Sequence, residues 1–346
     1  MKERLTRLLK LGLKYGAYVG YPAFYLLALA VFAALTFPYD KLKQRVVASF
    51  NAEQQASPTP QELQIDEMGG YWLSGVRMKG VRLLSSSTEP GKAPSKLQID
   101  EATVRYGMLA GLIGHTSLNF DAYAFGGEVN GSYGVSGKDK SLEVTLDSVD
   151  LGEVDPVVQT LGVPVQGKLS GTVKLTMPEG KGSKASGTIA LEAKGVSVGD
   201  GKAKIKGALA LPKLDVGTLS LSADAKDGAL KITKLAAGGK DVELQGDGRV
   251  TMRDTVGESL CDAQVRFKIN DGYRNKNDIT KSLFGTPGST APALFELADP
   301  KVKQSKRADG FYAWTLRGAI AKIEFIPAGG AIGMNPGMGS PPRMSP

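Results

Sequence analysis

Cysteine and histidine are almost absent from this chain of 346 residues, which contains one of each. A lone cysteine, Cys261, cannot form a disulfide within the chain, and a lone histidine, His115, cannot build a zinc site by itself. No basic neighbour is placed to activate Cys261, which favours a small buried residue over a nucleophile. His115 lies in a Gly-His-Thr turn, which favours a position at a loop or strand end. We therefore expect no metal and no other cofactor.

Motifs for catalysis and nucleotide binding are also missing. The chain has no Walker A, GxGxxG, GxSxG or HExxH pattern, and residues 167–171 resemble a phosphate loop without the helix that should follow. The acidic pairs Asp66-Glu67 and Asp100-Glu101 cannot converge on a substrate, because adjacent residues of a strand point to opposite faces. The sequence therefore predicts a protein that is not an enzyme.

Positive charge is concentrated at the N-terminus. The formal net charge is +8, and five basic residues with one acidic residue in segment 1–14 account for half of it. No basic cluster with interleaved aromatic residues follows, so the sequence does not imply binding to nucleic acid. The mild remaining charge is compatible with a position near anionic lipid headgroups.

One long apolar stretch, residues 15–37, carries no charge. Its length suits a helix that crosses a hydrocarbon core about 30 Å thick. Basic segment 1–14 then stays in the cytoplasm, and the chain after the apolar stretch is exported. The alternative is a cleaved signal peptide, since residues 28–30 form an Ala-Leu-Ala cleavage pattern. The length of the apolar stretch favours a retained single-pass anchor, but both alternatives stay open.

A short helix and linker are predicted at residues 38–61, where Leu42, Val46, Val47 and Phe50 have helical spacing. Strand patterns then run through residues 62–326, with 44 glycines in the whole chain and many short turns. We expect a turn at Gly126-Gly127, a short helix from 155 and an aperiodic, disordered tail at residues 327–346.

The clearest strand alternates strictly over residues 168–177, with apolar residues on one face. Similar short strands follow at 189–193, 205–209, 219–223, 230–232, 242–244 and 250–252. Their spacing is typical of an antiparallel meander. The fold class is therefore mainly β: an N-terminal transmembrane helix, then a long, curved, mostly antiparallel sheet with few short helices.

The apolar face of this meander is aliphatic, with almost no aromatic residues and no helical patterns to cover it. It either closes on itself as a sandwich or barrel core, or remains an open groove for an apolar ligand. The candidate residues lining such a groove are Leu169, Val173, Leu175, Ile189, Leu191, Leu219 and Leu221.

Several segments together resemble the long form of the type II secretion system protein N family and, more broadly, AsmA-like envelope proteins. They are residues 37–42, 73–84 (LSGVRMKGVRLL), 97–112, 125–131 (FGGEVNG) and 155–171 (DPVVQTLGVPVQGKLSG). The resemblance implies a bacterial inner-membrane protein whose bulk is a periplasmic β-domain, here 62–326. It transfers no catalytic residues.

Two functions follow as expectations from this resemblance. In the first, the protein is an accessory or structural component of a type II secretion system, with other secretion proteins as partners. In the second, it is an AsmA-like protein that binds or transfers phospholipid along an apolar β-groove. The candidate apolar residues distinguish the two: buried against protein they weaken the lipid function, and accessible they favour it.

Overall fold

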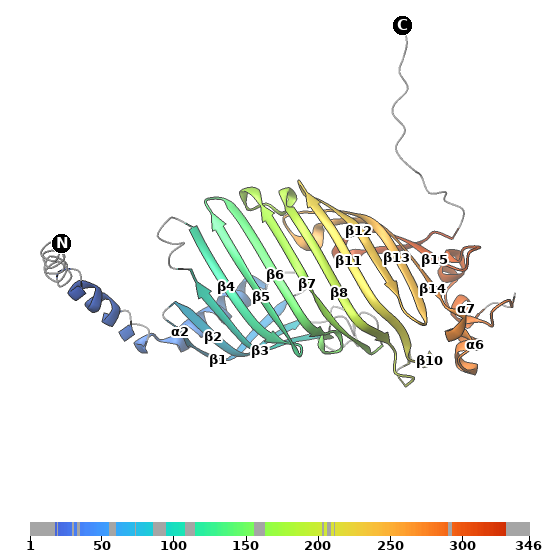
Figure 1. Cartoon of the computed structure of the whole chain (residues 1–346), viewed down its shortest axis with the longest axis horizontal. Helices are drawn as coiled ribbons and strands as arrows, with labels where there is room; N and C mark the ends of the chain where they lie inside the picture. The colour runs from blue at the N-terminus through green and yellow to red at the C-terminus, as the bar shows by residue number, and fades with distance from the viewer. Residues whose placement is uncertain are drawn as a thin grey trace, which may run out of the picture. The chain divides into compact units, whose positions relative to one another are not determined.

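The computed structural model of the chain (Figure 1) describes residues 18, 20–29, 31–32, 35–54, 60–72, 74–85, 95–107, 115–155, 163–202, 204–205, 209–210, 212–289 and 293–329. In these ranges, no helix combines the length and the apolar character that crossing a membrane requires. Basic segment 1–14, part of the predicted anchor 15–37 and tail residues 330–346 lie outside the described residues. So does most of the helix predicted from 155.

The fold is mainly β, as predicted, with antiparallel strands and few short helices. The chain divides into two compact units, one up to Gly137 and one from Lys138. In each unit the strands of the main sheet lie side by side in their order along the chain. The predicted β-domain 62–326 therefore spans both units.

In the described residues of the first unit, residues 20–29 are helical, and helix α2 (Tyr39–Gln54) is followed by five strands. The strands are β1 (Gln61–Tyr71), β2 (Gly75–Ser85), β3 (Ser95–Tyr106), β4 (His115–Ala124) and β5 (Gly127–Ser136). The helix predicted within 38–61 is confirmed. The turn expected at Gly126-Gly127 lies one residue earlier, because Gly127 already pairs with Ala124 and the positive φ angles fall at Phe125 and Gly126.

Helix α2 covers the free edge of β1. The side chain of Asn51 donates to the carbonyl of Leu63 and accepts from its backbone N–H, at 3.3 and 2.7 Å. Lys43 donates to the carbonyl of Asp66 at 3.0 Å. These bonds occupy backbone groups that an unprotected edge strand would offer to another chain.

Among its described residues, the second unit contributes nine strands to the main sheet. They are β6 (Asp139–Asp150), β7 (Val165–Met177), β8 (Ser186–Val198), β11 (Leu214–Lys226), β12 (Ala229–Gly238), β13 (Val242–Thr251), β14 (Leu260–Ile269), β15 (Tyr312–Ala319) and β16 (Glu324–Pro327). Short 3-10 turns occur at Leu151–Glu153, Pro178–Gly180, Gly182–Lys184, Val256–Glu258 and Ile320–Lys322.

Two details of the second unit correct the predicted pattern. The strand expected at 205–209 is instead a separate pair, β9 (Lys204–Ile205) with β10 (Leu209–Ala210), because β8 pairs directly with β11 and leaves no place between them. Pro327, the first residue of the expected tail, instead belongs to β16 and pairs with Trp314.

The helices of this unit form a cap at one end of its sheet, and we call this group the C-terminal cap. It comprises α5 (Asp271–Arg274), α6 (Asp278–Phe284), α7 (Leu294–Ala298) and α8 (Pro300–Ser305). Helix α6 begins with a capping box between Asn277 and Thr280. The main core cluster lies here, where the cap packs on strand residues: Val242, Ile269, Tyr273, Leu283 and Phe284.

Candidate functional site: an apolar face of the sheet

Strand registers in the second unit align the apolar residues into rows that cross the strands. Leu169 of β7 pairs with Ala193 of β8, which pairs with Leu219 of β11. Paired residues of neighbouring strands lie on the same face of a sheet. One such pairing therefore fixes which side chains gather on one surface.

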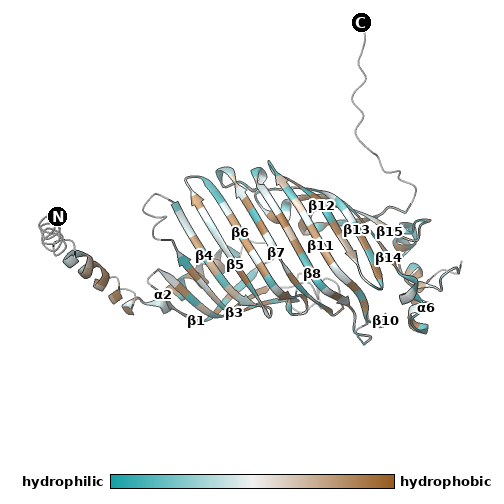
Figure 2. Cartoon of the chain, in the orientation of Figure 1, coloured by the Kyte–Doolittle hydropathy of each residue, from teal (hydrophilic) through white to brown (hydrophobic). Residues whose placement is uncertain are grey.

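Four rows of this kind, which we call ladders, make up the apolar face. Ladder one is Val149, Leu169, Ala193, Leu219, Ala237, Leu244, Phe267 and Tyr312. Ladder two is Leu146, Gly171, Leu191, Leu221, Leu235, Gly246, Val265, Trp314 and Pro327. Ladder three is Val144, Val173, Ile189, Ala223, Ile232, Gly248, Ala263, Leu316 and Phe325. Ladder four is Leu142, Leu175, Gly187, Ala225, Leu230, Val250, Cys261 and Gly318. Figure 2 shows brown and teal stretches alternating along these strands.

The structure brings all seven predicted groove residues onto this face. None of them is buried and none is fully exposed: each is half-buried. The fully buried positions of the ladders include small residues, such as Ala193, Ala223 and Ala263, which are 2%, 3% and 5% exposed. On this face the small alanine side chains are therefore buried, whereas the larger leucine, isoleucine and valine side chains beside them keep part of their surface accessible.

The opposite face of the same strands is polar. Lys174 pairs with Glu143 at 2.6 Å, and Lys168 pairs with Asp150 at 3.1 Å. These side chains are about half exposed, so the ion pairs contribute little to stability and mainly keep this face hydrated. The sheet of the second unit is therefore amphipathic, with one wet face and one aliphatic face.

Ladder one ends under the C-terminal cap. Phe267 stacks on Tyr312 with ring centroids 5.4 Å apart, and Phe295 of α7 meets Tyr312 edge-on at 5.6 Å. Phe284 of α6 contacts Phe295 at 5.5 Å. The cap thus covers the aromatic end of this ladder, whereas the predicted residues further along the apolar face stay half-buried.

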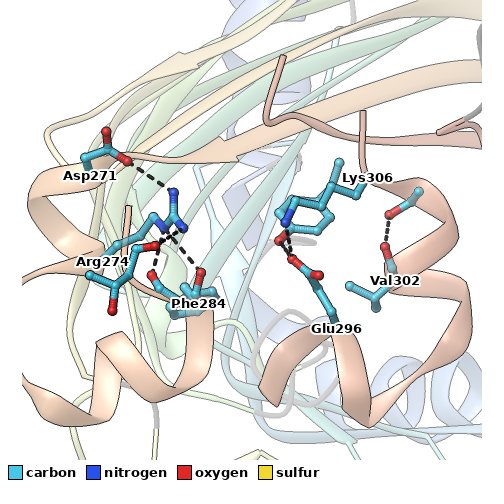
Figure 3. A network of polar contacts seen from close by, with 10 residues as sticks. Asp271, Arg274, Phe284, Glu296, Val302 and Lys306 are labelled. Carbon is cyan, nitrogen blue, oxygen red and sulfur yellow. Dashed lines mark hydrogen bonds and ion pairs between the residues drawn. The ribbon is translucent and has the colours of Figure 1, made fainter. Parts of the chain in front are cut away.

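A polar network holds the cap in place (Figure 3). The Glu296 carboxylate, 5% exposed, accepts from Lys306 Nζ at 2.7 Å and from the Tyr312 hydroxyl at 2.8 Å. Arg274 donates to the carbonyls of Phe284 and Gly285 at 3.2 and 3.1 Å, at the C-terminal end of α6. A cation there also complements the helix dipole.

Burial raises the pKa of Glu296, but the hydrogen bonds from Lys306 and Tyr312 outweigh it, so the net pKa lies below the ordinary 4.5. Burial and the Glu296 carboxylate together raise the pKa of Tyr312 well above 10.0. Glu296 is therefore ionised and Tyr312 protonated near neutral pH. This arrangement suits a structural bond in the cap more than proton transfer.

No family model, curated protein or solved structure matches the chain. The geometry of the apolar face and the resemblance given above therefore carry the functional argument. The single cysteine and the single histidine of the chain do not form a second candidate site. Cys261 is buried in ladder four, where burial and then Asp262 raise its pKa. His115 is exposed at the start of β4, and the described ranges contain no group of three metal-ligating side chains.

The far half of the apolar face was not among the predicted candidates. Its residues lie on β12 to β15 and include Leu235, Val265, Trp314 and Leu316. The alternation in 230–232, 250–252 and 265–269 indicates strands there. However, the pairing of β12 with its neighbours shifts between Ile232 and Leu235, so the alternation alone does not tell which residues share a face. Pairing is needed to align ladders across such an interruption.

Proposed function

We propose that the apolar face holds the acyl chains of phospholipids, and that the protein is an AsmA-like lipid-binding or lipid-transfer component of the bacterial envelope. The observation that carries this proposal is the accessibility of the large aliphatic side chains on the ladders. Each of these side chains keeps part of its surface accessible, and a continuous array of partly accessible aliphatic side chains in contact with water is unfavourable, so an apolar partner is expected to cover it. No catalytic group is required, in keeping with the expectation that the protein is not an enzyme.

The dimensions of the face support acyl chains as that partner. Ladder two crosses nine strands. At a strand spacing of about 4.8 Å, nine strands extend for roughly 38 Å, more than twice the roughly 15 Å that one leaflet contributes to a hydrocarbon core. Acyl chains are flexible and purely apolar, which suits the aliphatic part of the face on β7, β8 and β11; Tyr312 and Trp314 carry polar atoms further along the ladders.

Membrane attachment belongs to the same proposal. Residues 20–29 are helical, and large apolar side chains such as Phe24, Tyr25 and Leu29 are 64–70% exposed. We propose that they form part of a single-pass anchor at 15–37, with the N-terminus in the cytoplasm and both units in the periplasm. A membrane is the solvent in which such side chains are stable.

A charge on the face tests lipid binding. In Leu221→Asp, a carboxylate replaces a half-buried leucine near the middle of ladder two. The control Ser222→Asp places the same charge one residue further along β11, on the opposite, polar face of the sheet. Phospholipid bound per protein, measured by mass spectrometry after extraction from membranes, should fall about tenfold in Leu221→Asp, since desolvating a charge costs well over 1.4 kcal/mol. Ser222→Asp should keep the bound lipid. Hydrogen exchange of β11 verifies that both variants fold, and equal lipid content in both folded variants would refute the proposal.

A second candidate function is that of an accessory subunit of a type II secretion system. One observation favours it besides the resemblance: the edge strand β16 exposes Phe325 and Ile326, which are 57% and 41% accessible. Edge strands can recruit partners by strand addition. Crosslinking in cells followed by mass spectrometry of proteins and lipids in one sample separates the two functions. The second function would be favoured if secretion components crosslinked to the unchanged protein, were lost in Phe325→Asp, and no bound lipid was detected.

A further inference from the structure

The turn between β1 and β2 presents a tryptophan under unusual conditions. Trp72 is 78% exposed and has a φ of 52°. A bulky side chain is disfavoured in this left-handed region, where glycine or asparagine is normally found. The ring gains neither burial nor a favourable backbone conformation within the chain, which indicates a role in contact with something outside it.

Cations and aromatic rings surround this turn. The guanidinium carbons of Arg77 and Arg105 lie 4.9 and 5.7 Å from the ring centroid of Tyr71. Both arginine side chains remain about 45% exposed while pairing with carboxylates. Tyr106, next to Arg105, is 40% exposed. Its backbone N–H donates to the carbonyl of Ser74 at 3.0 Å, which places it at the same end of the strands.

The start of helix α2 joins this end of the first unit. A Cβ atom added to Gly70 would lie 2.6 Å from the Tyr39 hydroxyl, so the Tyr39 ring lies directly over β1 beside the turn. The ring of Phe37, which is 48% exposed, contacts that of Tyr39 at 5.0 Å. Immediately before them, Leu35 is helical and 79% exposed. The exposed apolar helix thus leads within a few residues to this aromatic and basic end.

We infer that this end of the first unit is a membrane-docking surface, which inserts Trp72 at the headgroup level of an anionic phospholipid bilayer. Tryptophan and tyrosine prefer the membrane interface, where an apolar ring and a polar edge are both satisfied. Arg77 and Arg105 are paired with Glu101 and Asp121 but stay about 45% exposed, so anionic headgroups can replace these carboxylates as their partners. The docking surface lies in the first unit and does not require lipid on the ladders of the second.

The two tryptophans of the chain make the test specific. Trp314→Phe leaves Trp72 as the only indole, and Trp72→Phe leaves Trp314, which is half-buried in ladder two. Each full-length variant is reconstituted into vesicles of phosphatidylcholine and phosphatidylglycerol that carry bromine either high or low on the acyl chains. Bromine quenches indole emission on contact, so each tryptophan reports its own depth.

Emission from Trp72 should fall roughly twofold with bromine near the headgroups and less with bromine near the chain ends, as for an interfacial residue. Replacing phosphatidylglycerol by phosphatidylcholine should weaken the quenching. Unchanged Trp72 emission with both brominated lipids would overturn the inference, as would stronger quenching from the chain ends. Quenching of Trp314 reports lipid on the ladders separately, so the docking surface and the proposed function can fail independently.

Discussion

Removing the Glu296 carboxylate should release the C-terminal cap. The carboxylate holds the Tyr312 hydroxyl and Lys306 Nζ at 2.8 and 2.7 Å, and connects α7 to α8 and β15. In Glu296→Ala the buried Tyr312 hydroxyl loses its acceptor, whereas Lys306 is 45% exposed and can regain water. The free energy of cap opening should fall by about 1–4 kcal/mol, the sum of about 1–3 for the unpaired hydroxyl and up to about 1 for the ion pair.

Two further variants separate the contributions. Glu296→Gln keeps an acceptor for Tyr312 and removes only the charge that faces Lys306; because Lys306 is 45% exposed and can regain water, the cost should be about 1 kcal/mol. Tyr312→Phe removes the donor and should cost about 1–2 kcal/mol, since it leaves Glu296 with Lys306 alone. Amide hydrogen exchange over 294–305 measures local opening directly, without assuming that the whole chain unfolds in one step. If Glu296→Gln opened the cap as much as Glu296→Ala while Tyr312→Phe had no effect, the ion pair would hold the cap and the reasoning would be refuted.

Three other outcomes follow. Because the folded-state pKa of Glu296 is below its ordinary 4.5, its contribution to stability is complete above that value and is lost as pH falls through the lower folded pKa. The protection of amides in 294–305, corrected for the intrinsic exchange rate at each pH, should therefore fall only in acid, and a loss of protection near neutral pH would count against this. Asn51→Ala should speed exchange at the Leu63 amide by about tenfold and favour association through β1, seen as larger particles in light scattering; an unchanged Leu63 amide would mean that Asn51 does not protect the edge. In Gly187→Ala the new Cβ would overlap the carbonyl oxygen of Lys174, so the pairing of β7 with β8 should weaken by about 1–3 kcal/mol. Hydrogen exchange of the β7 amides measures this, and unaltered exchange would show that the backbone adjusts freely.

Alternation alone predicted most strands of the second unit and the apolar residues of β7, β8 and β11 that lie on the ladders. Leu169, Val173 and Leu175 fall on one face because side-chain direction has period two, whatever the strand later pairs with. Residues 189–193 and 219–223 follow the same rule. Alternation could not predict which residues of neighbouring strands pair, because the ladders depend on register shifts such as the one between Leu146 and Val149.

Short helices of the cap were mostly missed, because helices of four to seven residues complete too few turns to show a period. Terminal signals were nevertheless present: Asn277 with Thr280 forms the capping box of α6, and Asp299-Pro300 starts α8. Contacts between Glu296, Lys306 and Tyr312 join segments whose proximity only the folded sheet determines.

The chain-order topology of the second unit makes the size of its apolar face adjustable. Each strand of the main sheet pairs only with the preceding and following strands of that sheet, and each ladder receives one residue from each strand that it crosses. Inserting or deleting one hairpin would therefore lengthen or shorten the face by about 10 Å, twice the strand spacing, without altering the remaining registers. A gene encoding such a sheet can change the reach of the protein by duplicating a segment of about 25 residues, close to the span of two strands and a turn.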